Sequence, residues 1–160
     1  MADGILIRPI DAGDSAAWTE MWAAYLVFYK VSLSEEVTAA TWARIIDPSG
    51  PVEALLATDA HGGALGFANY LLHPYTWSDK PTCYLEDLYV RPEARGRGVG
   101  RALIERLVAL GREQGWGRLY WTTQQDNATA RRLYDRFGPA DDVVRYTIAL
   151  DGTHPTGGEV

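Results

Sequence analysis

The chain has 160 residues, a length that favours one domain, and its 47% apolar and 22% charged residues are ordinary for a globular protein. A single cysteine and three histidines exclude a disulfide framework and a closed structural zinc site, and no apolar run is long enough to span a bilayer. The first twenty residues lack the basic start and apolar core of a signal peptide, so we expect a cytoplasmic protein. We expect residues 1–150 to form the domain and residues 151–160 to form a flexible tail.

The net charge of −6 is distributed unevenly along the chain. Residues 91–136 hold ten arginines against five acidic residues, whereas the rest of the chain holds five basic and sixteen acidic residues. An acidic protein is poorly suited to binding a phosphate backbone, so we expect no nucleic-acid partner. The split instead indicates a phosphate-like ligand near the arginines and a cationic partner elsewhere, although solvated surface charge also clusters without any function.

The first half of the chain predicts one strand, two helices and a β-hairpin, over residues 4–10, 15–30, 34–46, and 52–58 with 64–72. Asp14 and Ser34 stand where the two helices begin, and we expect each to act as an N-cap. The hairpin loop contains two glycines, as a tight connection requires.

The second half alternates strands with helices, over residues 82–90 (strand), 99–111 (helix), 119–123 (strand), 127–137 (helix) and 143–150 (strand). The helix over 99–111 has the clearest pattern, because its apolar residues keep to one face and its arginines to the other. Strands and helices in this order predict a single α/β (α+β layered) structure.

A glycine-rich turn, Arg95-Gly96-Arg97-Gly98-Val99-Gly100, lies between the strand over 82–90 and the amphipathic helix. Glycines let several backbone N–H groups face one concavity, and the helix N-terminus adds a partial positive charge, so the turn is suited to phosphate. A Walker A loop would continue with Lys-Ser/Thr and a dinucleotide fingerprint with a third glycine, but this chain continues with Arg101-Ala102. An RGG-type RNA-binding segment would be repetitive, which this stretch is not.

The remaining pattern, Gln/Arg-x-x-Gly-x-Gly/Ala, is carried by Arg95, Gly98 and Gly100. It resembles the pyrophosphate turn of the GNAT superfamily of acetyl-CoA-dependent N-acetyltransferases. Residues 84–92 resemble the strand that holds the pantetheine arm in that family, and residues 127–138 resemble its second motif, although Pro139 stands where the family has an aromatic residue. The resemblance implies a GNAT fold, with a central mixed, mostly antiparallel, twisted sheet of six to seven strands flanked by about four helices.

The same resemblance implies acetyl-CoA as co-substrate and no metal. The residues that would cradle the pyrophosphate are Arg95, Gly96, Arg97, Gly98, Val99, Gly100 and Arg101. Those that would contact the pantetheine arm are Leu88, Tyr89, Val90, Asn127, Ala130 and Tyr134.

Within the superfamily, the sequence around Glu86 and Tyr134 most resembles the diamine (spermidine/spermine) acetyltransferases and the small histone-acetylating relatives. That resemblance implies Glu86 as general base or amine anchor and Tyr134 as general acid to the sulfur of CoA. Successive strand residues point to opposite faces, so we expect Glu86 and Asp87 on opposite sides of the sheet, with Asp87 as the alternative base.

Aromatic residues are candidates for the acceptor site, because rings bind ammonium groups by cation–π contacts. The candidate substrate-binding residues are Tyr25, Tyr29, Glu86, Asp87 and Trp121. The aromatic residues of the first helix have helical spacing, however, and core packing is the stronger interpretation of that pattern. Cys83 is expected to be buried and inert.

These features together favour an N-acetyltransferase in which a primary amine attacks acetyl-CoA directly in a ternary complex. The acceptor would be a polyamine, a lysine-like amino acid or another small cationic amine. A protein or peptide acetyltransferase, acting on histone-like lysines or N-termini, is the alternative enzyme. A non-catalytic acyl-CoA-binding regulatory module is a third possibility, which could dispense with Glu86 and Tyr134. The resemblance alone implies a homodimer, and we expect no membrane partner because the apolar runs are short.

Overall fold

The computed structural model describes residues 4–152. Its strands and helices, in chain order, are β1 (Leu6–Pro9), α1 (Ser15–Phe28), α2 (Glu35–Ile46), β2 (Val52–Thr58), β3 (Ala64–His73), β4 (Thr82–Val90), α3 (Val99–Gln114), β5 (Arg118–Tyr120) and α4 (Ala128–Tyr134). The five strands form one sheet in the order β1-β2-β3-β4-β5, antiparallel throughout except for the parallel pair β4 and β5. The mixed, mostly antiparallel sheet expected from the sequence is therefore confirmed.

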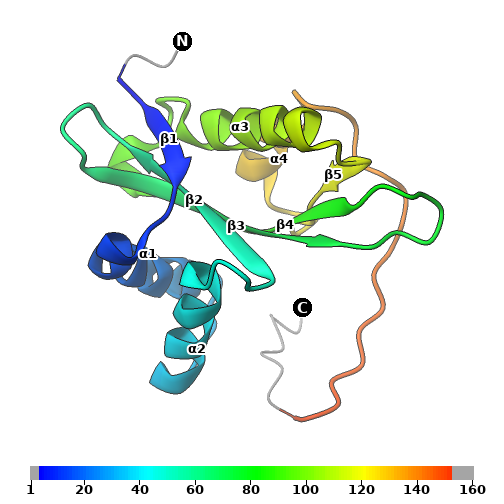
Figure 1. Cartoon of the computed structure of the whole chain (residues 1–160), viewed down its shortest axis with the longest axis horizontal. Coiled ribbons are helices and arrows are strands. Elements are labelled where there is room, and N and C mark those ends of the chain that lie inside the picture. The colour runs from blue at the N-terminus through cyan, green and yellow to red at the C-terminus, as the bar shows by residue number, and fades with distance from the viewer. Residues whose placement is uncertain (1–3, 153–160) are drawn as a thin grey trace.

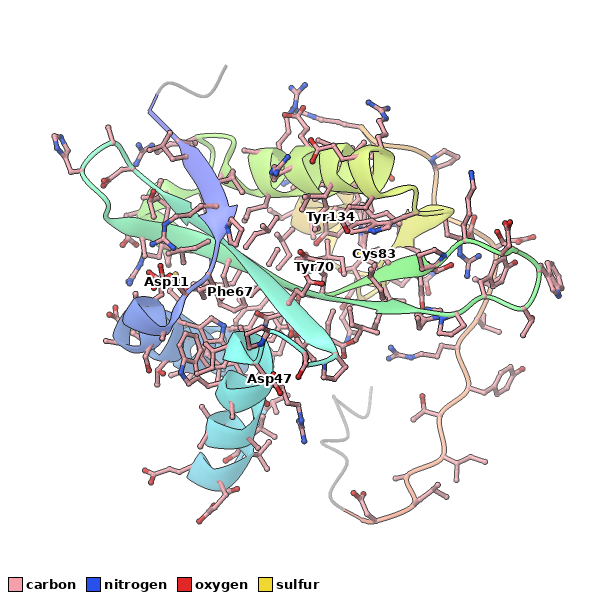
Figure 2. The ribbon with its side chains drawn as sticks, viewed as in Figure 1. Asp11, Asp47, Phe67, Tyr70, Cys83 and Tyr134 are labelled. Carbon is pink, nitrogen blue, oxygen red and sulfur yellow. The ribbon has the colours of Figure 1, made fainter. Side chains whose placement is uncertain are left out.

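Each face of the sheet has its own hydrophobic core. Leu103, Ile104 and Leu107 of α3 are fully buried against one face, and Trp18 and Met21 of α1 are buried against the other. Figure 1 shows α3 and α4 on the first face and α1 and α2 on the second. In Figure 2 Phe67 lies toward α1, whereas Cys83 and Tyr134 lie on the side of α3. Burying one such large side chain contributes about 1.5–3 kcal/mol, so both helix layers hold the sheet in place.

A β-bulge interrupts the pairing of β3 with β4. Asn69 pairs with Asp87 and Tyr70 pairs with Leu85, so Glu86 is an extra residue on β4. Leu85 packs in the core under α3, whereas Tyr89 packs in the core under α1. Strict alternation would put residues 85, 87 and 89 on one face, so the extra residue has reversed the alternation. The expectation that Glu86 and Asp87 face opposite sides is wrong, because the bulge turns both toward the α1 face.

Strands β4 and β5 separate soon after they meet. Their pairing joins Thr82–Tyr84 to Arg118–Tyr120, while β4 continues to Val90. The backbone of Leu88–Val90 therefore has no strand beside it on the β5 side of the described sheet.

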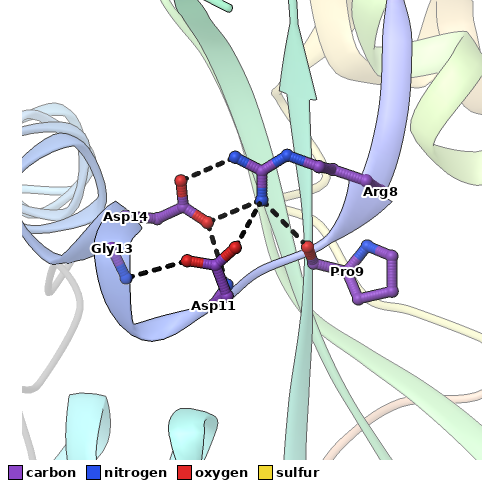
Figure 3. A network of polar contacts seen from close by, with 5 residues as sticks. All are labelled: Arg8, Pro9, Asp11, Gly13 and Asp14. Carbon is purple, nitrogen blue, oxygen red and sulfur yellow. Dashed lines mark hydrogen bonds and ion pairs between the residues drawn. The ribbon is translucent and has the colours of Figure 1, made fainter.

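The chain enters α1 through a polar turn that the sequence pattern did not predict (Figure 3). Asp14 occupies the N-cap position of α1, but its carboxylate caps no N–H group of that helix. It accepts two hydrogen bonds of 2.7 Å from the Arg8 guanidinium and one of 2.9 Å from the backbone N–H of Asp11. Asp11 accepts a hydrogen bond from the backbone N–H of Gly13 and so closes the 3-10 turn before the helix. The Asp14 cap is thus wrong, because Arg8 competes for its carboxylate. The Ser34 cap of α2 is confirmed by its bond from the N–H of Val37.

The predicted strand over residues 143–150 is wrong. The backbone there is irregular, and the side chains of Val143, Val144, Tyr146, Ile148 and Leu150 are between 75% and 93% exposed. A strand needs a neighbour to complete its hydrogen bonds, and after α4 the chain runs away from the sheet (Figure 1). The predicted strand over 119–123 is also shortened, to Arg118–Tyr120. Without a strand over 143–150, the sheet of the described residues has five strands rather than six or seven. Most of the expected tail, residues 153–160, lies outside the described residues.

Between residues 4 and 152 no helix is both long enough and apolar enough to cross a membrane. The same residues contain no group of three or more His, Cys, Asp or Glu side chains that could hold a metal ion. Cys83 is fully buried, and burial raises the pKa of its thiol to about 12. It is therefore a core residue that stays protonated at neutral pH, as expected.

Candidate active site

The glycine-rich turn leads directly into α3. Gly96 and Gly98 have φ angles of +77° and +88°, in the left-handed region that favours glycine. No side chain among the described residues caps α3, and the first three N–H groups of a helix have no partner within it. The turn thus presents free donors at the positive end of the helix dipole, which fits the pyrophosphate of a CoA molecule.

Three arginines surround this turn. Arg95 donates to the carbonyl of Val90 at 3.2 Å and lies 5.8 Å from the ring centre of Phe28, and Arg101 pairs with Glu105 at 2.7 Å. Arg97 is exposed on the loop itself. Arginine suits phosphate recognition because its fork of N–H groups matches phosphate oxygens.

Gly100 allows α3 to approach its neighbours closely. A Cβ atom at this position would lie 3.1 Å from the Leu133 side chain and 3.7 Å from that of Val90. Because α4 packs against α3 here, its last residue, Tyr134, is brought toward the separated end of β4. Val99 is buried in the same core, so its contribution to a ligand is its backbone.

The pantetheine candidates on β4 offer their backbone. Leu88 and Val90 pack on the core under α3, and Tyr89 is buried in the core under α1. The backbone beside them is the segment of β4 that has no neighbouring strand, and extended ligands add to such an edge by main-chain hydrogen bonds.

Asn127 begins α4. Its side-chain oxygen accepts from the N–H of Ala130 at 3.2 Å, and its amide nitrogen donates to the hydroxyl of Thr123 at 3.3 Å. The oxygen of the amide therefore caps the helix and its nitrogen binds the preceding loop, while Ala130 is half-buried in the first turns of α4. This cap sets where α4 begins and hence where Tyr134 lies.

Tyr134 is half-buried at the end of α4, with its ring centre 5.4 Å from that of Trp121. Burial raises the pKa of its phenol to about 12, and the nearby Tyr29 adds to the rise. The phenol is therefore protonated at neutral pH and can donate a proton.

The two carboxyl groups of the bulge have different surroundings. Asp87 is half-buried and accepts hydrogen bonds from the amide of Asn69, at 3.0 Å, and from the hydroxyl of Tyr25. Burial raises the pKa of Asp87, and these two bonds oppose the rise. Glu86 is more exposed, and partial desolvation together with the Asp87 charge raises its pKa, against the opposing charge of Arg145.

Tyr25 and Tyr29 stand at the end of α1 with their ring centres 4.8 Å apart. Tyr25 also stacks on Trp22 at 5.3 Å, so it belongs to the core and reaches the site with its hydroxyl. Burial raises the pKa of both phenols, and the charge of Asp87 adds to each rise.

The structure thus brings most of the sequence-predicted residues to one region. Tyr25 donates a hydrogen bond to Asp87, and the charges of Asp87 and Glu86 raise its pKa, while Asp87 raises the pKa of Tyr29 and Tyr29 that of Tyr134. Trp121 joins the region only by its contact with Tyr134. Sequence reasoning missed Asn69, although a polar residue inside an apolar strand was a usable signal.

The comparisons with known proteins agree with this geometry. The chain matches the Acetyltransferase (GNAT) family over residues 16–138, and it belongs to that family. It is 39% identical over 145 residues to the D-amino-acid N-acetyltransferase HPA3 of Saccharomyces cerevisiae, covering 90% of each chain. It is 31% identical to the aminoglycoside N(6')-acetyltransferase type 1 of Klebsiella aerogenes, covering 78% of this chain and 82% of the relative.

A solved structure described as a probable acetyltransferase has the same fold, with a TM-score of 0.81, 23% identity, and coverage of 91% of this chain and 98% of the other. The protein is therefore a GNAT N-acetyltransferase, and the family uses acetyl-CoA as its co-substrate. The finer resemblance to diamine acetyltransferases stays a prediction.

Proposed function

We propose that this protein transfers the acetyl group of acetyl-CoA to a primary amine of a small cationic acceptor, by direct attack in a ternary complex in the cytoplasm. The observation that carries the proposal is the open end of β4 beside the glycine-rich turn, with the carboxyl pair Glu86 and Asp87 on the same strand and a protonated phenol, Tyr134, at the end of the helix that packs against that turn.

Binding of the co-substrate is assigned to the turn and the strand edge. The N–H groups of Gly98–Arg101 and the side chains of Arg95 and Arg97 would hold the pyrophosphate, and the backbone of Leu88–Val90 would hold the pantetheine arm. Acetyl-CoA supplies an acetyl group activated as a thioester. Holding it beside the amine replaces an encounter in solution by a positioned reaction, which can lower the barrier by several kcal/mol.

The acceptor must first lose a proton. An alkyl ammonium has a pKa near ~10.4, so exposing the free amine at pH 7 costs about 4–5 kcal/mol. The carboxyl pair of the bulge binds the ammonium and accepts that proton, directly or through water. The amine nitrogen then forms a bond to the acetyl carbon as the carbon–sulfur bond breaks. The departing thiolate takes its proton from Tyr134, which is restored from solvent.

The negative charge of the chain outside the arginine-rich segment and the aromatic rings of the site both favour a cationic acceptor. The chain outside residues 91–136 has a net charge of −11, and the site places two carboxyl groups beside Tyr25 and Tyr29. Acidic surroundings attract an ammonium group, although they also raise its pKa and so oppose its deprotonation. We place polyamines and lysine-like amino acids first, followed by other cationic amines.

A peptide acceptor is the alternative, and the loop after β3 supports it. An open hollow of about 310 Å³ lies over residues 72–75 and 78–81, next to Trp77, whose side chain is 86% exposed. A longer substrate could rest there while its amine reaches the carboxyl pair.

The testing experiment measures thiol release from acetyl-CoA with spermidine, spermine, lysine analogues, D-amino acids, aminoglycosides and basic peptides. Acetyl-CoA binding is measured by calorimetry on the same preparation. Turnover with small cationic amines supports the proposal, and turnover with peptides alone supports the alternative. Tight binding without any turnover would contradict both and favour a non-catalytic acyl-CoA-binding module.

A further inference from the structure

Asp87 is held by a chain of hydrogen bonds that begins in the core of α1. The indole N–H of Trp18 donates to the side-chain oxygen of Asn69 at 3.3 Å, and the amide nitrogen of Asn69 donates to Asp87 at 3.0 Å. Trp18 is fully buried and Asn69 is 1% exposed, so water does not compete for the bond between them, and the bond to Asp87 is partly buried. Tyr25 donates to the same carboxylate from the next turns of α1.

The direction of this chain has a chemical consequence. An indole N–H can only donate, so it binds the oxygen end of the Asn69 amide and leaves the NH₂ end for Asp87. An NH₂ group stabilises a charged carboxylate, whereas an amide oxygen would stabilise the protonated acid. Trp18 thus selects the orientation of Asn69 that keeps Asp87 able to accept a proton.

Glu86 is not held in this way. It is exposed and forms no side-chain hydrogen bond within the described part of the chain, where its charged neighbours are Asp87 and Arg145. Without hydrogen bonds to fix its position, the Glu86 carboxylate can move with a bound ammonium. For the same reason, the protein does not fix the distance between this carboxylate and the reacting nitrogen. Asp87, with two donors, has one orientation.

We propose that Trp18 and Asn69 are positioning residues, which hold Asp87 as the group that accepts the proton of the acceptor ammonium while Glu86 anchors that ammonium. This inference rests on the proposed function and deepens it. The proton passes from the amine nitrogen to a carboxylate oxygen of Asp87 and then to water, so the carboxylate is restored in each cycle.

The other titratable groups that face Asp87 are Tyr25 and Tyr29 from α1 and Glu86 on its own strand; β3 contributes only the neutral Asn69. Both tyrosines have raised pKa values and stay neutral across the acid range. The acid limb of the pH profile of kcat/KM therefore reports the carboxyl pair, with Asp87 as the group that must be ionised.

The chain offers a matched pair of variants. Trp18→Phe removes the indole N–H that orients Asn69. Trp22→Phe makes the same change one turn later on α1. It is the control, because the indole N–H that it removes is buried and has no partner in the described structure. Trp18→Phe is expected to move the acid limb upward by about half a unit to one unit, the effect of one hydrogen bond. Trp22→Phe is expected to leave it in place.

Two further variants separate the carboxyl groups. Asp87→Asn is expected to remove the acid limb and lower kcat/KM by about 100-fold, in line with general base catalysis. Glu86→Gln is expected to keep the limb and raise KM for the amine. Asn69→Asp, which puts a second carboxyl group beside Asp87, is expected to move the limb further upward than Trp18→Phe does.

A measurement without turnover completes the test. The ¹³C signal of the Asp87 carboxyl, identified by its loss in Asp87→Asn, is titrated in the wild type and in both tryptophan variants. An upward shift in Trp18→Phe alone supports the positioning role even if no acceptor is acetylated, in which case only the proposed function fails. Equal shifts in the two variants, or an acid limb that disappears in Glu86→Gln and survives in Asp87→Asn, would overturn the inference.

Discussion

Tyr134 combines burial with a position at the end of α4, next to the separated strands. Replacing it by phenylalanine removes the proton donor and keeps the ring contact with Trp121. We expect kcat to fall by about 100-fold, as is typical for the loss of a general acid, with little change in acetyl-CoA affinity. Steady-state kinetics and calorimetry test this, and an unchanged kcat would exclude Tyr134 as the acid.

The ion pair between Arg8 and Asp14 predicts a pH-dependent stability. Hydrogen bonds from Arg8 hold the pKa of Asp14 below its usual value of 3.8. A lowered folded-state pKa contributes stability that is present above the unfolded pKa and is lost as pH falls through the folded one. Because Arg8 is partly exposed, we expect Asp14→Asn to lower the free energy of unfolding at pH 7 by only about 1 kcal/mol.

Urea unfolding at pH 7 and at pH 2.5 measures this contribution, and the difference between wild type and Asp14→Asn is expected to shrink at the lower pH. Glu20→Gln is the control, because Glu20 also pairs with an arginine at 2.7 Å but its side chain is 68% exposed. A larger loss for Glu20→Gln than for Asp14→Asn would contradict the argument from burial.

Among the elements, the turn before α3 allows a test of acetyl-CoA binding. The test distinguishes the effect of backbone strain at a glycine from the effect of a lost contact with the ligand. Gly96 and Gly62 both have φ near +80°, and a Cβ at either would meet no atom within 4 Å. Alanine at either position should cost about 1–2 kcal/mol of stability, because both would force a left-handed backbone. We expect only Gly96→Ala to weaken acetyl-CoA binding, by tenfold or more, since only that turn is proposed to hold the pyrophosphate.

Thermal unfolding measures the stability of both variants, and calorimetry measures their affinity for acetyl-CoA. An equal loss of affinity in Gly62→Ala would mean that general destabilisation, rather than the turn, controls binding.

The bulge on β4 is the element that most changes the site. Alternation along a regular strand would separate Glu86 from Asp87, whereas the extra residue places both beside Tyr25. Bulges re-aim side chains next to active sites at little cost in sheet pairing. No local pattern around residue 86 reveals the bulge, because it depends on the register with β3.

At the scale of the whole molecule, segment 143–150 exposes a row of apolar side chains. Its side chains alternate in a strand-like pattern and its large apolar residues are 75–93% exposed, while within residues 4–152 no further strand pairs with the outer edge of β5. We propose a homodimer in which this segment of each copy adds to β5 of the other, burying apolar surface and completing the hydrogen bonds of the edge.

Light scattering of the full chain is expected to give the mass of two copies. The double variant Val144→Asp with Ile148→Asp is expected to be monomeric, because both residues fall on one face of the segment. Thr147→Asp, on its other face, is the control and should stay dimeric. A monomeric wild type would refute the dimer, and a dimer unaffected by the double variant would place its interface elsewhere.

The sequence by itself determined the features that depend on neighbouring residues. The glycine turn, the amphipathic helix after it and the motif around Tyr134 are each contiguous, so their resemblance to the GNAT family, and the acetyl-CoA chemistry which that resemblance implies, could be recognised without the fold. Local patterns, namely apolar periodicity for α3 and turn residues for α1 and α2, likewise placed the long helices within a few residues of their observed bounds.

Only the tertiary structure decided what depends on pairing between distant segments. The bulge that puts Glu86 beside Asp87 arises from register with β3, and the hydrogen bonds from Trp18 to Asn69 and on to Asp87 span about 70 residues of chain. Residues 143–150 were predicted as a strand but are irregular in the structure, because a strand forms only where another strand completes its hydrogen bonds.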